Sequence, residues 1–348
     1  MTRKAKRISY LVRAGALFAL IGLFFGLLFV PEQAEPCAAE AANPAKPQAI
    51  KWVDFNVTSA VLSQALSYDV ESFGTEHHAG MVDLLALTAA KTGAKWGKGE
   101  SKELKDFYER IAGGETVETL AADCPYFSYY REAYDAVLGG FVGEYAIEEP
   151  DGANGTKTVN RYGLKVFSPI AKGYGFGHYD DFGSPRSYGF SRPHLGNDLM
   201  GAVGTPLVAV EDGVVEALGW NQYGGWRIGI RSHDRRRYYY YAHLRKDHPY
   251  VEGLQEGDTV RAGDVIGYLG MTGYSTEENV NNIDVPHLHF GMQLIFDESQ
   301  KDGANEIWID VYQIVELLQQ NRSAVKKNTD TEEYERVYHF VGEPGRSG

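Results

Sequence analysis

The chain of 348 residues is 43% hydrophobic and 23% charged, which is ordinary for a globular protein and long enough for about two domains. Its formal net charge of −13 at pH 7 argues against a protein that binds nucleic acid. Two cysteines, Cys37 and Cys124, are too few for a disulfide-rich scaffold, and without a C-x-x-C pair they do not predict a thiolate zinc site.

The N-terminal segment predicts export. Five basic residues up to Arg13, with no acidic residue among them, precede the uncharged run 14–30. A helix of that length spans ~26 Å, near the lower limit for crossing a bilayer. We therefore expect residues 1–30 to form a cytoplasmic basic flank and a transmembrane anchor, which gives a single-pass membrane protein with an extracytoplasmic C-terminal part. The alternative is a signal peptide, cleaved near residues 37–41, and a secreted product.

A linker and a helical module follow. Residues 31–49, rich in Ala, Pro and Glu, predict an extended linker. Residues 50–147 follow a helical period, in which Leu104, Phe107 and Ile111 share one face. We expect a small helical module that acts as a spacer or binds a protein partner. Glu71-Ser72 is a short match to the catalytic pair of lysozyme-like transglycosylases, but the other signals of that family are missing.

The second half of the chain changes to a β pattern. Short β-rich segments, separated by Gly, Asp and Asn clusters, cover residues 206–210, 213–218, 226–231, 238–243, 264–269 and 287–295. Their close spacing predicts antiparallel sheets. Residues 307–320 predict an amphipathic helix that covers the sheet, and residues 323–348 a loose polar tail. The expected fold class is α+β: an N-terminal transmembrane helix, a small helical module, and a mainly antiparallel β domain over residues 160–322.

Four of the ten histidines gather in three short β or loop segments of this domain. The period of two along a strand places His287 and His289 on one face. The same rule places Tyr239, Tyr241 and His243 together on a face of another strand.

The first of the three segments also contains a carboxylate. His194 and Asp198 are four residues apart, and Gly196 between them lets the backbone bend so that both reach one ion. Three nitrogen or oxygen ligands, an open position for water and spare histidines are the inventory of a catalytic zinc centre.

These segments carry a resemblance to a known family. The motifs His194-x-Gly196-x-Asp198, Tyr241-x-His243-Leu244 and His287-x-His289-Phe290 resemble those of the lysostaphin-type (LytM-like) zinc peptidoglycan endopeptidases, over about residues 167–294. The resemblance implies that His194, Asp198 and His289 bind Zn²⁺. It implies that His243 and His287 are the catalytic pair, and leaves open which of them is the base.

The function that this resemblance implies is a zinc metalloendopeptidase that cleaves the peptide stems or cross-bridges of bacterial peptidoglycan. One alternative is a LytM-like scaffold or activator that does not cleave, in a membrane-associated division or sporulation complex. Another is a zinc protease that acts on secreted proteins. The complete ligand set favours catalysis over the scaffold, because the loss of a ligand is what marks such domains.

Two departures from the family pattern and an aromatic run concern the substrate cleft. The loop 272–286 is longer than usual and is expected to border the cleft, and Gly291 stands where an acidic residue is common. Six aromatic residues between positions 174 and 190 either wall a groove for a peptide or pack as a loop on the sheet.

Overall fold

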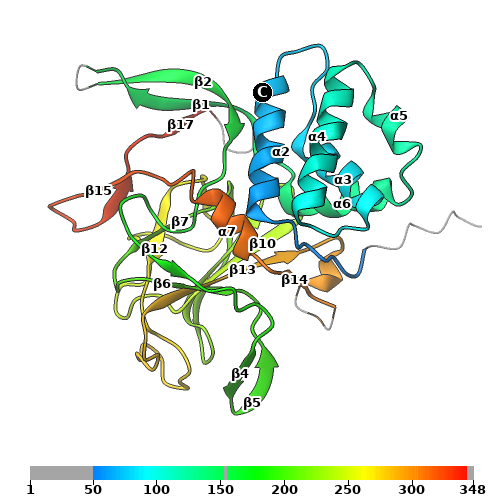
Figure 1. Cartoon of the computed structure of the whole chain (residues 1–348). Coiled ribbons are helices and arrows are strands. Elements are labelled where there is room, and N and C mark those ends of the chain that lie inside the picture. Colours follow the sequence, from blue (N-terminus) through cyan, green and yellow to red (C-terminus); the bar gives the residue numbers. More distant parts are fainter. Residues whose placement is uncertain (1–49, 153–154, 302, 304, 343–348) are drawn as a thin grey trace, which may run out of the picture. The chain divides into compact units, whose positions relative to one another are not determined.

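The structure, a computed structural model, describes residues 50–152, 155–301, 303 and 305–342 (Figure 1). Within these ranges no helix is both long and apolar enough to cross a bilayer. This corrects two expectations, the transmembrane helix in the fold class and the single-pass membrane localisation, since neither has support in the described structure. The run 14–30, for which the helix was predicted, and the linker 31–49 lie outside the described residues.

The predicted small helical module is present. Its helices are α2 Ser59–Ser72, α3 Met81–Thr92, α4 Lys98–Ala112, α5 Val117–Ala121 and α6 Phe127–Leu138. Leu104, Phe107 and Ile111 are buried on α4, as their helical period predicts. Ser72 is buried and its hydroxyl donates to the Tyr68 carbonyl of the preceding turn, which is a structural role rather than a catalytic one.

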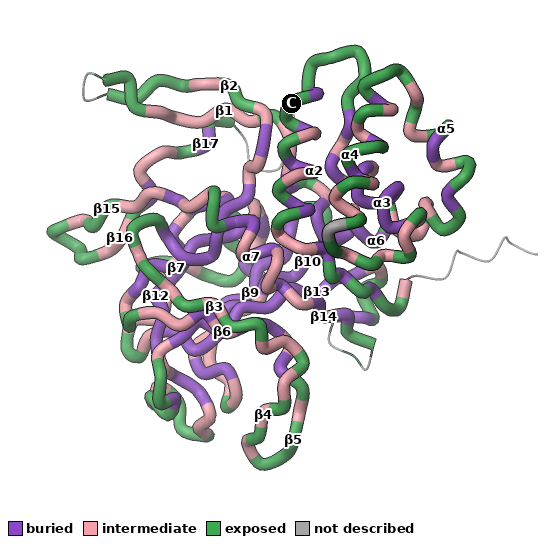
Figure 2. The backbone as a smooth tube through the Cα atoms, in the orientation of Figure 1, coloured by how far each residue is buried: buried purple, intermediate pink, exposed green. Residues whose placement is uncertain are grey.

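The main sheet is antiparallel and has eight strands. Seven follow the order β11-β8-β9-β10-β13-β6-β3, and β14 pairs with β13 as well. Their bounds are β3 Gly177–His178, β6 Asn197–Met200, β8 Gly213–Asn221, β9 Gly225–Ser232, β10 Arg237–Ala242, β11 Thr259–Val260, β13 His287–Leu294 and β14 Ile307–Ile309. All eight residues of β13 are buried, and Figure 2 shows burial concentrated around β9, β10 and β13. The expected antiparallel β domain is therefore confirmed.

Smaller sheets surround this one. They are β1 Val142–Pro150 with β2 Thr156–Leu164 and β17 Phe340–Val341, β4 Pro185–Tyr188 with β5 Phe190–Pro193, β7 Pro206–Val208 with β12 Val265–Tyr268, and β15 Val325–Lys327 with β16 Tyr334–Arg336. Strands β15 to β17 occupy the segment expected to be a loose tail. Their pairing was not visible in a polar sequence that lacks an apolar period.

The expected helix over 307–320 is shorter than predicted. Its first residues form β14, which pairs with β13, and only Tyr312–Leu318 form helix α7. Helix α7 contacts α2, where the Ser59 N–H donates to the Gln313 side chain at 2.7 Å. The alternation of Ile307 and Ile309, both buried, suits a strand better than the helix that the wider window indicated.

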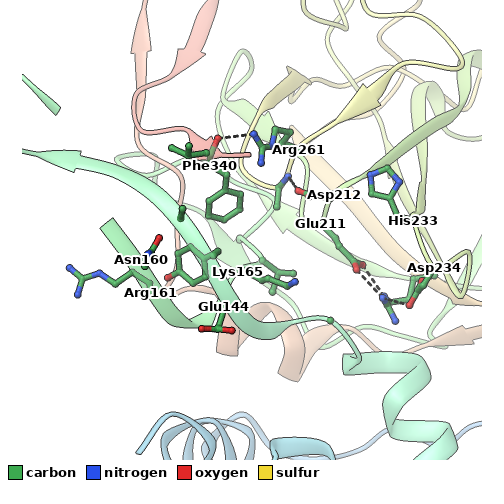
Figure 3. A pocket seen from close by; sticks show the side chains of 17 residues that line it. Glu144, Asn160, Arg161, Lys165, Glu211, Asp212, His233, Asp234, Arg261 and Phe340 are labelled. Carbon is green, nitrogen blue, oxygen red and sulfur yellow. Dashed lines mark hydrogen bonds and ion pairs between the residues drawn. The ribbon is translucent and has the colours of Figure 1, made fainter. Parts of the chain in front are cut away.

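A buried arginine joins the helical module to the sheet. Arg237, on β10 and 1% exposed, donates at 2.8 Å to both carboxylate oxygens of Glu211 and to Asp234. It also donates at 3.0 Å to the carbonyl of Ala136 on α6. Arg237, Glu211 and Asp234 line a cavity of about 490 Å³ that contains none of the four motif histidines (Figure 3).

Replacing Arg237 by leucine is expected to lower the free energy of unfolding by about 3 to 5 kcal/mol, because Glu211 would keep a mostly buried charge without its partner. Denaturant unfolding of the two proteins measures the difference. Arg235→Leu is the matched control: this side chain is 62% exposed, and its loss should change stability by less than about 0.5 kcal/mol. Equal losses in the two variants would contradict the prediction.

Candidate metal centre

Two neighbouring strands bring together the three residues that were expected to bind zinc, His194, Asp198 and His289. Asp198 on β6 lies directly opposite His289 on β13, and His194 precedes β6 in the turn after β5. Gly196 is required here for a close approach rather than for a special backbone angle. A Cβ atom at Gly196 would lie 2.6 Å from the Phe290 carbonyl and 2.8 Å from the His289 ring.

The potential ligand atoms of these three residues lie within 4.8 Å of one another. His194 Nε2 is 2.7 Å from His289 Nδ1 and 3.1 Å from Asp198 Oδ1, and His289 Nδ1 is 3.5 Å from the same oxygen. Donors that share one tetrahedral zinc ion at 2.0–2.1 Å lie about 3.3 Å apart. The spacing therefore suits one small cation.

The carboxylate oxygen at the centre of this group supports the same conclusion. Asp198 Oδ1 is buried and accepts no hydrogen bond from any residue that the structure describes. A buried acceptor without a donor costs free energy, and a metal ion would satisfy it. The residues present therefore fit a metal ion.

The protonation of the group suits metal binding as well. Burial alone would raise the pKa of Asp198, but the imidazoles of His194 and His289 and the charge of His287 hold it well below its usual range. Burial lowers the pKa of His289, although Asp198 opposes the shift. An ionised carboxylate beside a neutral imidazole is the form in which both bind a metal.

An ion-pair cluster from the preceding loop and hairpin supports these residues. Arg186 on β4 donates at 2.9 Å to Asp198 Oδ2 and also pairs with Asp181. The Asp181 carbonyl lies 3.2 Å from His194 Nδ1. Nδ1 also lies 3.2 Å from Arg186 Nη2, and the two contacts fix the orientation of the ring, with Nε2 directed to His289 and Asp198. No motif in the sequence indicated Asp181 or Arg186.

The two other motif histidines lie beside this group. The rings of His243 and His287 are 4.8 Å apart, and His287 Nε2 is 3.6 Å from Asp198 Oδ1. His243 Nδ1 donates to the Thr272 carbonyl at 2.9 Å, and His287 Nδ1 to the Val285 carbonyl at 2.8 Å. In both rings Nδ1 therefore holds the proton, and Nε2 is left as a free acceptor among the described residues.

The electrostatic setting keeps His243 neutral. Burial, followed by the charges of His287 and His289, lowers the pKa of His243 well below its ordinary value. A neutral imidazole can accept a proton, so the chemistry available here is that of a general base or a hydrogen-bond partner.

The prediction that His243 shares a strand face with Tyr239 and Tyr241 is wrong, although its side chain does lie beside the donor group. Tyr239 and Tyr241 point into the core, where Tyr241 Oη accepts from the Val210 N–H at 3.0 Å. His243 follows the last residue of β10 with φ of 63°, in the left-handed region, and this angle breaks the alternation of the strand. Its side chain therefore turns to the histidine group.

Loop 272–286 borders the histidine group, as expected. Gly273 has φ of 124°, and a Cβ atom there would lie 2.9 Å from His243 Nδ1 and 2.6 Å from the Tyr223 carbonyl. Only glycine fits this approach. The next residue, Tyr274, places its ring 5.7 Å from that of His243.

Gly291, the other departure from the family pattern, has a steric cause in this chain. A Cβ atom there would lie 2.7 Å from the Leu195 carbonyl and 2.9 Å from the Trp308 ring. Trp308 on β14 occupies the space that a side chain at position 291 would need.

The aromatic run between positions 174 and 190 divides between the two roles weighed for it. Tyr174 and Phe176 pack on the hydrophobic core. Tyr188 and Phe190 instead contact Tyr223, at ring distances of 6.0 Å each. Tyr188 also contacts Tyr274, at 5.4 Å, so the second part of the run lies close to the histidines.

Comparison with known proteins places this geometry in context. Residues 192–302 match Peptidase family M23. An L-Ala–D-Glu endopeptidase of Bacillus subtilis (strain 168) is 39% identical over 124 residues, which are 36% of this chain and 36% of that protein. The glycyl-glycine endopeptidase ALE-1 of Staphylococcus capitis is 40% identical over 120 residues, 34% of this chain and 28% of that protein.

A solved structure gives a further match. The catalytic domain of lysostaphin from Staphylococcus simulans is 35% identical, with a TM-score of 0.28, and the match covers 35% of this chain and 80% of that one. The matched part spans about a third of the length of the two curated relatives.

Proposed function

Because residues 192–302 form a domain of peptidase family M23, we propose that this chain is a zinc-dependent endopeptidase that cleaves peptide bonds in bacterial peptidoglycan. The observation that carries the proposal is the donor group of His194, Asp198 and His289, with its unpartnered carboxylate oxygen. The endopeptidases named among its relatives support the peptide bond as substrate.

In this proposal His194, Asp198 and His289 hold the ion, as the resemblance of their motifs implies. A bound zinc ion supplies a Lewis acid for the carbonyl of the scissile bond. Three protein donors would hold the ion, which is the number that catalytic zinc sites use.

In this proposal His243 and His287 are the residues that transfer protons. Each ring holds its own proton at Nδ1 through a carbonyl oxygen, so each Nε2 can accept a proton from water. Once it is protonated, the Nε2–H can donate to the developing oxyanion. The carbonyls of Thr272 and Val285 also fix the ring planes. The proton that Nε2 accepts can then pass to the departing amine.

The test uses the full chain with purified peptidoglycan. We expect about one zinc per chain, and new peptide ends after incubation with peptidoglycan. A chelator should abolish this cleavage, and added zinc should restore it. Casein serves as the comparison substrate. If the chain binds zinc but leaves peptidoglycan intact, the proposal is contradicted. If it hydrolyses casein at the same rate as peptidoglycan, the assignment of peptidoglycan as the substrate is contradicted.

Arg186→Gln is expected to weaken zinc affinity by about 10- to 100-fold, because the variant loses the charged donor that orients Asp198. Competition with a fluorescent chelator measures the affinity. Arg161→Gln is the control, since that arginine pairs with Glu149 on the β1–β2 hairpin and should leave zinc affinity unchanged. Unaltered affinity in the Arg186 variant would show that the ion pair has no positioning role.

A further inference from the structure

Among the residues that the structure describes, an arginine beside the histidine group has no carboxylate partner. Arg192 on β5 lies directly opposite Arg186 in the β4–β5 hairpin, so the two side chains project from the same face. Arg186 pairs with Asp181 and Asp198. Arg192 forms no ion pair with any residue that the structure describes.

The contacts that Arg192 does make are aromatic. Its guanidinium lies over the rings of Tyr223 and Tyr274, at 5.3 and 5.8 Å, and Nη2 donates to the Tyr274 hydroxyl at 3.3 Å. Nε is buried without an acceptor, and within the described part of the chain Nη1 donates no hydrogen bond. The two rings hold the guanidinium in place but do not neutralise its charge.

Arg192 is also close to the proposed catalytic pair. Tyr274 lies between Arg192 and His243, since it contacts the guanidinium and its ring is 5.7 Å from the His243 ring. The Tyr274 N–H donates to the Tyr223 carbonyl at 3.2 Å, which fixes the two tyrosines relative to each other. A substrate group at Arg192 would therefore lie on the far side of the Tyr274 ring from His243, close to the proposed site of cleavage.

We propose that Arg192 forms a carboxylate-binding subsite, and that the substrate is an acidic peptide with a free carboxylate next to the scissile bond. The inference rests on the proposed function and refines its substrate class. A guanidinium matches a carboxylate with paired charge-assisted hydrogen bonds, and a preoriented one loses little entropy on binding. A glutamyl stem peptide provides such a carboxylate, whereas a polyglycine cross-bridge has none along its length.

The test compares two synthetic peptides, L-Ala–γ-D-Glu–L-Lys with a free α-carboxylate on the glutamyl residue, and the same peptide with that group as a carboxamide. The zinc-loaded full chain is expected to cleave the acid with a kcat/KM about 10- to 100-fold higher than the amide. Arg192→Gln should remove this preference by slowing cleavage of the acid alone. Arg227→Gln is the matched control: Arg227 has a buried, unpartnered Nε as well, and its variant should keep the preference.

A binding measurement separates this inference from the proposed function. Calorimetry with the His287→Ala variant compares the affinities of the acid and the amide without cleavage, and then repeats the comparison with Arg192→Gln added. If the acid binds more tightly than the amide, and Arg192→Gln abolishes this difference, the result supports the subsite. This holds even if the wild-type chain cleaves neither peptide. Equal affinities for the two peptides, or equal losses for both in the Arg192 variant, would overturn it.

Discussion

A His289→Ala variant is expected to lose its bound zinc and at least about 10³-fold in the rate of peptidoglycan hydrolysis. His289 is buried on the central strand β13, with Nδ1 2.7 Å from His194 Nε2 and 3.5 Å from Asp198 Oδ1. Two ligands alone bind zinc poorly, because a structural or catalytic site needs at least three. Losing the Lewis acid removes about 4 kcal/mol of transition-state stabilisation, and each 1.36 kcal/mol is a factor of ten in rate.

The measurement is zinc per chain by elemental analysis, together with the initial rate of release of new amino termini from purified peptidoglycan. Because β13 is buried, near-ultraviolet circular dichroism establishes that the variant keeps its tertiary packing. His233→Ala, which replaces an exposed histidine in the β9–β10 turn, is the control and should retain both metal and rate. A His289 variant with full zinc content would show that the donor group is assigned wrongly.

That His194, Asp198 and His289 form one group was implied by the resemblance of their motifs to a known family, whereas the pairs His194–Asp198 and His287–His289 follow from a short turn and a strand period of two. The same alternation places His287 beside them, while Leu288 is buried on the other face. The alternation of residues along one strand does not indicate the register in which that strand pairs with its neighbours. Only the fold shows that β13 lies between β10 and β6 and sets His289 opposite Asp198.

The parts that could not be predicted depend on contacts distant in the sequence. His243 reaches the site through a left-handed residue after β10, which strand alternation cannot indicate. Asp181 and Arg186 contact the proposed ligands because a loop and hairpin fold back over β6. The helix predicted over residues 307–320 begins late because β13 has a free edge for β14 to pair with, and tertiary pairing overrides a helical period.

The His287→Ala variant is expected to keep its zinc and to lose about 10²- to 10⁴-fold in kcat, the usual range for a group that transfers protons in the transition state. His287 Nε2 lies 3.6 Å from Asp198 Oδ1, which is close enough to reach a water molecule or substrate in the site. His243→Ala should have a loss of the same order, since its ring is 4.8 Å from that of His287 and its Nδ1 is held in the same way. Zinc content and single-turnover cleavage of a peptide substrate are the measurements, with His77→Ala, an exposed histidine of the helical module, as the control.

The double variant His243→Ala/His287→Ala tests whether the two histidines act as one unit. Two groups that cooperate in the same proton transfer are non-additive, so the double variant should be only slightly slower than the slower single variant. Independent contributions would instead multiply, and the combined loss would reach about 10⁴-fold or more for two losses of about 10²-fold each. A multiplicative loss with unchanged zinc content would mean that the two rings contribute independently. Loss of zinc in either single variant would mean that its ring is a ligand.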